Sequence, residues 1–148
     1  MFKHLLVTLD GSPRAEAVIP HSIGVARSMG AEITLLRVVE AVGADWSERG
    51  ALGKSQVDAT LGTAFGEQAG DYLGRVALQI RQSGVKVRTL VRQGVPARQI
   101  VATAADIEAD AIAMATHSRR GINRLMFGSV AEEVLHSSSV PVLLVRAG

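Results

Sequence analysis

Apolar positions along this chain switch between two spacings, and the switch predicts alternating strands and helices. Short, nearly continuous apolar runs are typical of strands buried on both faces, and they cover residues 3–9, 33–39, 85–91, 110–115 and 140–146. Helical spacing covers about residues 12–28, 58–83, 94–108 and 130–138. This β-α-β-α-β-α-β-α-β order predicts one α/β domain over residues 1–148: an open, doubly wound, Rossmann-like sheet of five parallel strands with helices on both faces.

Local signals set some of the boundaries. Ser12 is a good N-cap for the first helix, and Pro13 has the fixed φ that suits a first helical position. Ser129 and Glu132 have the Ser-x-x-Glu spacing of a capping box, which predicts that Ser129 caps the last helix. Residues 40–57 have no clean period and are expected to form an exposed loop.

Glycines recur every four residues in the second helix, at Gly62, Gly66, Gly70 and Gly74. Each should cost the helix about 0.8–1.0 kcal/mol relative to Ala. One interpretation is a flexible helix packed closely on the sheet, with an apolar stripe of Leu61, Phe65, Tyr72, Val76 and Ile80. The other is a glycine groove that admits another backbone. Charged residues between the glycines exclude a membrane motif.

Composition narrows the classes of function. The chain of 148 residues has no cysteine, which removes disulfides, thiolate catalysis and Cys-ligated metals. Charged residues interrupt every apolar stretch well short of the roughly 18 residues that span a bilayer. No signal peptide is recognisable, so a cytoplasmic protein with no membrane partner is expected. Aromatic residues are only 3% and the formal net charge is +2, so nucleic-acid binding is not predicted.

Several kinds of chemistry are excluded by spacing. The Gly53-Lys54-Ser55 tripeptide resembles the end of a P-loop, but position 48 is Glu48 instead of glycine. No Gly-x-Gly-x-x-Gly follows the first strand, no Gly-x-Ser-x-Gly is present, and no carboxylate cluster forms a phospho-acceptor. The four histidines lack metal-ligand spacing. We therefore expect neither a metal site nor a catalytic residue, with slow nucleotide hydrolysis left open.

The most informative segment follows the fourth strand. Open α/β sheets bind ligands beyond the carboxyl ends of their strands. Residues 111–131 contain no acid, but they include His117, Arg119, Arg120 and Arg124. The free N–H groups of the next helix, with arginines nearby, would bind phosphate. Two simpler interpretations remain open: Ser129 is only a cap, and the arginines only belong to a solvated loop.

Five fragments together resemble a single-domain universal stress protein over nearly the whole chain. They are Leu-Leu-Val-Thr-Leu-Asp-Gly-Ser at 5–12, Leu-Leu-Arg-Val-Val at 35–39, Gly94-x-Pro96, Gly-Ser-Val-Ala-Glu-Glu-Val-Leu at 128–135 and Val-Pro-Val-Leu-Leu-Val at 140–145. The resemblance implies a similar α/β domain that commonly forms homodimers through its last strand. It also implies that the chain is related to many proteins that bind ATP or AMP.

ATP-binding members of this family carry Gly-x2-Gly-x9-Gly-Ser/Thr after the fourth strand. Here Ala115 and Ser118 occupy the first two glycine positions, whereas Gly128 and Ser129 match. A Cβ at the first two positions can obstruct phosphate oxygens, and family members without the full motif resemble a class that does not hold ATP.

The resemblance also implies a set of ligand-binding residues. Asp10 and the backbone of Val38 would contact the adenine and ribose, and Gly128, Ser129 and Val130 the phosphates. Arg119 is a further candidate phosphate ligand in the same loop.

The expected function is therefore a stress-response module whose shape or dimer contacts respond to ATP or AMP. The alternative is a dimeric universal stress protein that does not bind ATP and acts as a protein-interaction module through its dimer surface and residues 40–57. A homodimer through Val140–Arg146 is predicted because an apolar edge strand needs a cover; the alternative is an edge that Pro141 and Arg146 protect from pairing. Whether magnesium accompanies a nucleotide is left open.

Overall fold

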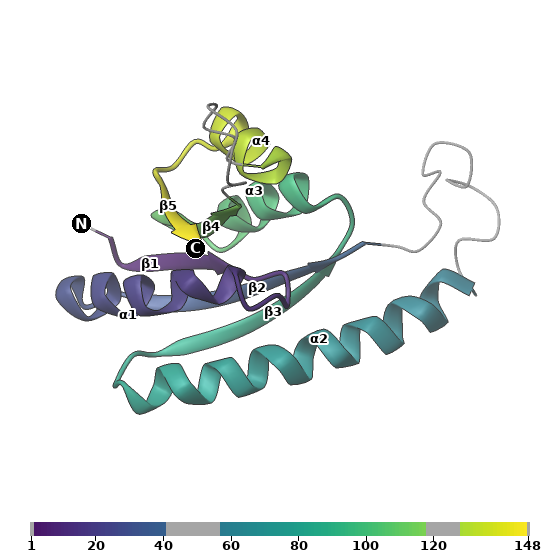
Figure 1. The fold of residues 1–148 in the computed structure, drawn as a ribbon, viewed down its shortest axis with the longest axis horizontal. Coiled ribbons are helices and arrows are strands. Elements are labelled where there is room, and N and C mark those ends of the chain that lie inside the picture. The colour runs from purple at the N-terminus through teal and green to yellow at the C-terminus, as the bar shows by residue number, and fades with distance from the viewer. Residues whose placement is uncertain (1, 41–56, 118–127, 148) are drawn as a thin grey trace.

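The structure is a computed structural model that describes residues 2–40, 57–117 and 128–147, with the side chains of 57–65 and 117 left undescribed. One sheet of five parallel strands has the order β3-β2-β1-β4-β5 (Figure 1). The strands are β1 (His4–Thr8), β2 (Glu32–Val39), β3 (Val87–Gln93), β4 (Ala111–His117) and β5 (Val142–Ala147). The helical elements are η1 (Ala15–Ala17), α1 (Val18–Met29), α2 (Val57–Gln82), α3 (Pro96–Asp106) and α4 (Ser129–Ser137).

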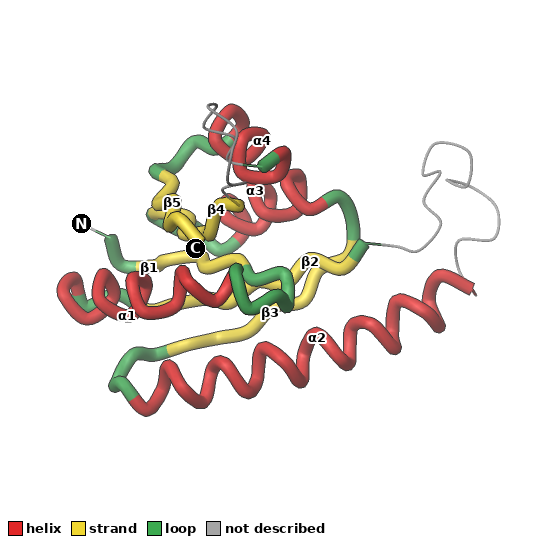
Figure 2. The backbone as a smooth tube through the Cα atoms, viewed as in Figure 1, coloured by secondary structure: helices red, strands yellow, loops and turns green. Residues whose placement is uncertain are grey.

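Helices cover both faces of the sheet, as the apolar runs predict. Figure 2 shows α1 and α2 on one side of the strands, and α3 and α4 on the other. Successive strand residues alternate between these layers: Leu5 and Val7 pack with α1 and α2, whereas Leu6 packs with α3 and α4. The predicted doubly wound α/β fold is confirmed.

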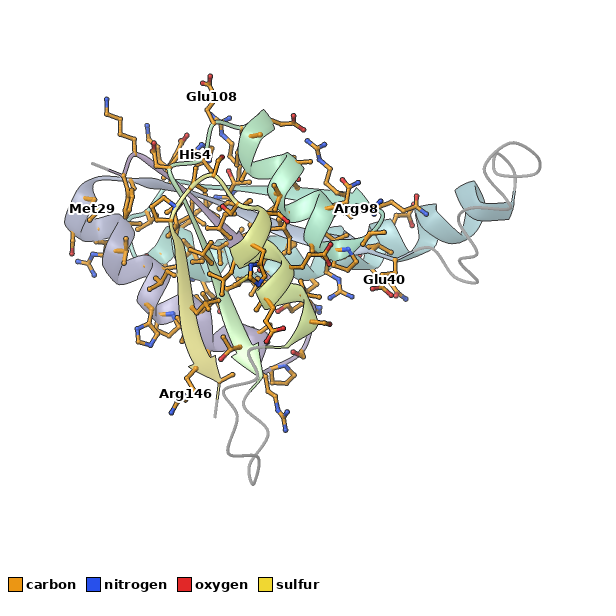
Figure 3. The ribbon with its side chains drawn as sticks, turned by 90° about the horizontal axis from the view of Figure 1, so that it is seen from above. His4, Met29, Glu40, Arg98, Glu108 and Arg146 are labelled. Carbon is orange, nitrogen blue, oxygen red and sulfur yellow. The ribbon has the colours of Figure 1, made fainter. Side chains whose placement is uncertain are left out.

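The strand order reverses at β1. The chain moves from β1 outward through β2 to β3, then returns to β4 on the other side of β1 and ends at β5. Both crossovers that leave this point start at the carboxyl ends of β1 and β4. A ligand crevice is therefore expected at this edge, between β1 and β4. Figure 3 shows that Arg146, at the carboxyl end of β5, lies away from His4 and Glu108 at the opposite edge.

The first helix begins later than its capping signal predicts. Ser12 does accept a hydrogen bond from the N–H of Ala15 at 3.2 Å, as an N-cap would. However, residues 15–17 form a 3-10 turn and the α-helix begins at Val18, so Pro13 is not its first residue. The side chains of Asp10 and Ser12 both bond to nearby backbone N–H groups, and such bonds favour a turn over a helix.

One further strand boundary and one burial pattern differ from the expectation. β4 continues past Ala115 to His117, because Thr116 and His117 still pair with β5. The third strand is expected to place Val85, Val87, Thr89 and Val91 on one face. Val85 and Val87 are buried, but Thr89 is exposed, because β3 is a strand at the edge of the sheet.

The glycines of α2 do not pack closely on the sheet. No described atom lies within 4 Å of where a Cβ would stand at Gly66, Gly70 or Gly74. The residues of α2 that belong to the core on this face of the sheet are Leu73, Val76, Ala77 and Ile80, with Tyr72 half-buried. The helix does pack on the sheet, and Tyr72, Val76 and Ile80 of the expected stripe take part, but Gly66, Gly70 and Gly74 do not make the contact. Leu61, Gly62 and Phe65 have no described side-chain surroundings, and a groove for another backbone stays a prediction.

Candidate functional site

The end of β1 places Asp10 at the reversal point of the sheet. The β1–β2 ladder ends where the N–H of Leu9 donates to the carbonyl of Leu36 at 2.9 Å. Asp10 follows immediately and is exposed, and its Oδ1 accepts the N–H of Ser12 at 2.8 Å. Gly11, between them, has φ +86, a left-handed conformation that favours glycine. This tight turn holds the carboxylate at the carboxyl edge.

The backbone of Val38 is directed toward the same point. In β2, odd-numbered residues bond to the β3 side, as the carbonyl of Val39 does with the N–H of Gly94. Even-numbered residues bond to the β1 side, as Leu36 does. Val38 therefore turns its N–H and C=O toward β1, one step beyond the last described bond of that ladder. Peptide groups in this position can pair with the edge of a planar ligand.

The N-terminus of α4 offers hydrogen-bond donors on the other side of β1. Gly128 is the N-cap, with φ 85 and ψ 152, and its carbonyl accepts the first helical bond, from the N–H of Glu132 at 3.0 Å. The N–H groups of Ser129, Val130 and Ala131 precede this bond and have no partner within the helix. Together with the helix dipole they favour an anion.

The predicted capping box is wrong. Ser129 is the first helical residue and the cap is Gly128, which makes no side-chain hydrogen bond. Glycine reaches the positive φ of the cap position, so the chain enters the helix without a serine cap. Ser129 is exposed at the start of the helix.

The remaining candidates are placed only in part. Ala115 lies within β4, opposite Val145 of β5, and its half-buried side chain packs against the α1–α2 core. It is therefore on the face of the sheet away from α4. Ser118 and Arg119 lie outside the described residues, as do Arg120 and Arg124. The structure thus brings the ends of β1, β2 and β4 and the start of α4 to one edge.

Two polar residues that the sequence analysis did not assign to the site, Arg37 and Tyr72, lie near the turn that carries Asp10. The guanidinium of Arg37 packs against Gly11, and its buried Nη1 has no hydrogen-bond partner among the described residues. The hydroxyl of Tyr72 is buried in the same way. Burial, and next the carboxylate of Glu16, raise the pKa of Tyr72 to about 12. One signal was available: Arg37 interrupts an otherwise apolar strand at 35–39.

Other kinds of site are not seen in the described part of the chain. No group of three or more His, Asp or Glu residues in it could hold a metal ion. None of its helices is long and apolar enough to cross a membrane.

This arrangement defines a class: doubly wound α/β domains with a helix N-terminus and a carboxylate at the reversal of the strand order. Within that class, the model of the universal stress protein family matches residues 1–146, and the chain belongs to this family. The universal stress protein MJ0531 of Methanocaldococcus jannaschii is 32% identical over 146 residues, which cover 99% of this chain and 83% of the relative.

Solved structures agree on the fold. That of MJ0577, a universal stress protein of the same organism, has a TM-score of 0.81 at 27% identity and covers 100% of this chain and 98% of its own. Two more distant universal stress protein structures hold nucleotides. One, from Archaeoglobus fulgidus, is a complex with dAMP (TM-score 0.64, 20% identity, 97% of both chains). The other is a complex with cAMP (TM-score 0.63, 16% identity, 99% and 98%).

Proposed function

We propose that this chain is a stress-response module that binds an adenine nucleotide, ATP or AMP, at the crevice between β1 and β4. The N-terminus of α4 carries the proposal, because N–H groups that have no partner within the helix and a glycine cap lie at the carboxyl edge where the strand order reverses. The dAMP and cAMP complexes in the same family support an adenine nucleotide as the ligand.

The ligand would span the end of β1. Its base would pair with the peptide groups of Val38, and Asp10 would accept a hydrogen bond from the ribose or the base. Its phosphates would lie on Gly128, Ser129 and Val130, and the proposal includes Ser118 and Arg119, which lie outside the described residues, as further phosphate ligands. Binding without rapid turnover is part of the proposal, as are a single domain and a cytoplasmic location.

Ala115 at a usual glycine position is compatible with this ligand. Its methyl group packs against the α1–α2 core, whereas α4 packs on the opposite face of the sheet. The extra carbon therefore adds volume on the side away from the proposed phosphate position. Glycine at 115 should change nucleotide affinity less than twofold.

A protein-interaction module that does not bind ATP is the second candidate, and a homodimer through Val140–Arg146 belongs to both. β5 is an edge strand, so one side of its backbone has no neighbour in the sheet. Leu143 on β5 is 37% exposed and Leu135 on α4 is 41% exposed. A second copy that pairs with β5 would complete the ladder and cover this apolar strand.

Isothermal titration with ATP and AMP, with and without magnesium, separates the two candidates. Arg119→Ala and Arg146→Ala form a matched pair, because each removes one guanidinium, from the proposed phosphate loop or from β5. We expect Arg119→Ala to weaken ATP binding several-fold and to leave adenosine binding unchanged, with Arg146→Ala near wild type. No binding at millimolar nucleotide would leave the interaction module as the function.

A further inference from the structure

Arg37 is charged, yet it sits in an apolar strand with its guanidinium under the turn that carries Asp10. The Cζ of Arg37 lies 3.0 Å, and Nη2 3.3 Å, from the position that a Cβ on Gly11 would occupy, and Nη1 lies closer still. The guanidinium therefore packs directly on the backbone of Gly11. Only a residue without a side chain leaves room for this contact.

The charge of Arg37 is partly removed from water. Its Nη1 is buried and finds no hydrogen-bond acceptor among the described residues. A buried cation is costly unless an opposite charge lies nearby. Asp10 precedes Gly11 in the turn above the guanidinium, so its carboxylate can attract Arg37 through space.

Tyr72 on α2 lies near the same group of residues, Arg37 and the 10–12 turn. Burial raises the pKa of its hydroxyl most. The carboxylates of Glu16 and Asp10 raise this pKa further, and the guanidinium of Arg37 lowers it. The charges of Glu16, Asp10 and Arg37, from η1, the 10–12 turn and β2, therefore all act on this hydroxyl of α2. Charges in such a half-buried region act on each other more strongly than in open water.

We propose that Arg37 is a positioning residue that holds Asp10 at the carboxyl edge of β1, ready for a nucleotide. The N–H of Ser12 fixes one oxygen of Asp10 at 2.8 Å. Arg37, from below, supports the turn and attracts the carboxylate, which disfavours a turn in which Asp10 swings into solvent. The inference rests on the proposed function, because it assigns Arg37 a part in that same site.

The test uses the full chain and compares four variants with wild type. Arg37→Met removes the charge and keeps much of the apolar stem, Arg37→Lys keeps the charge, and Gly11→Ala places a Cβ against the guanidinium. Arg92→Met is the matched control. Arg92 lies on β3, and its guanidinium pairs at 3.3 Å with the exposed carboxylate of Asp106 on α3. Calorimetric titration gives the ATP affinity, and thermal unfolding shows that each variant is folded.

Arg37→Met and Gly11→Ala should weaken ATP binding about tenfold, the scale of one charge-assisted interaction. Arg37→Lys should recover part of the loss, and Arg92→Met should stay within twofold of wild type. The sharpest measurement is a double-mutant cycle with Asp10→Asn. If Arg37 acts through Asp10, Arg37→Met should cost less than a further twofold in the Asp10→Asn background.

Folded Arg37→Met protein with wild-type ATP affinity would overturn the inference. The inference would also be overturned if Arg37→Met weakened ATP binding by the same factor in the Asp10→Asn background as in wild type. If Arg37→Met does not fold, Arg37→Gln, which also removes the charge and leaves Gly11 unchanged, decides in the same way. Wild-type protein that binds no nucleotide overturns the proposed function and this inference together. If wild-type protein binds ATP and the Arg37 variants bind it with the same affinity, only the inference about Arg37 is overturned.

Discussion

Replacing Gly128 with alanine tests the N-terminus of α4 through the backbone alone. The added Cβ meets no described atom within 4 Å, so steric contact contributes nothing. The cost comes from φ 85 and ψ 152, a region that is essentially restricted to glycine. A non-glycine residue held there costs about 1–3 kcal/mol. For a chain of 148 residues, each kcal/mol lowers the unfolding midpoint by about 3 °C.

If the backbone relaxes to relieve this strain, the affinity for the ligand should change as well. If the backbone at 128 rotates to a negative φ, the N–H groups of Ser129 and Val130 turn with the start of the helix. Donors that bind phosphate depend on direction, so we expect ATP affinity to fall about tenfold while adenosine affinity stays unchanged. Denaturant unfolding measures the first effect, and titration with both ligands measures the second.

Gly30→Ala is the control. Gly30 also has a positive φ, 65, and open space at its Cβ, but it caps the carboxyl end of α1, at the opposite edge of the sheet. Alanine there should cost roughly 1–2 kcal/mol of stability and leave nucleotide binding unchanged. If Gly128→Ala loses stability but binds ATP as Gly30→Ala does, the α4 N-terminus does not hold the phosphates.

Two further predictions concern stability and assembly. The backbone N–H groups of Lys3 and His4 donate to Asp110 at 2.7 and 2.9 Å and hold its pKa below the ordinary value. A lowered folded-state pKa stabilises the fold above about pH 4, so Asp110→Asn should be less stable than wild type at pH 7, and urea titrations should show the gap closing as the pH falls below about 4. Leu143→Glu should convert a homodimer to monomer in sedimentation velocity, while Leu78→Glu, at a site 58% exposed on α2, should not; equal behaviour of the two would argue against a β5 interface.

The regular part of the fold was predictable because it depends on local periodicity. Strands buried on both faces have apolar runs, and a helix between two such runs forces parallel pairing. The start of the first helix was not predictable from its capping signal. There the side chains of Asp10 and Ser12 bond to nearby N–H groups, and this local competition delays the α-helix to Val18.

The candidate site was predictable only where it consists of backbone. A glycine before a helix can be found in the sequence, and Gly128 was found in this way, whereas Val38 was named from the resemblance to the family. Arg37 and Gly11 are 26 positions apart in the chain, and their contact exists only because β1 and β2 are neighbours in the sheet. A charged residue within an apolar strand, such as Arg37, therefore indicates a candidate site residue. Burying the charge is costly, and a carboxylate in the neighbouring turn reduces that cost.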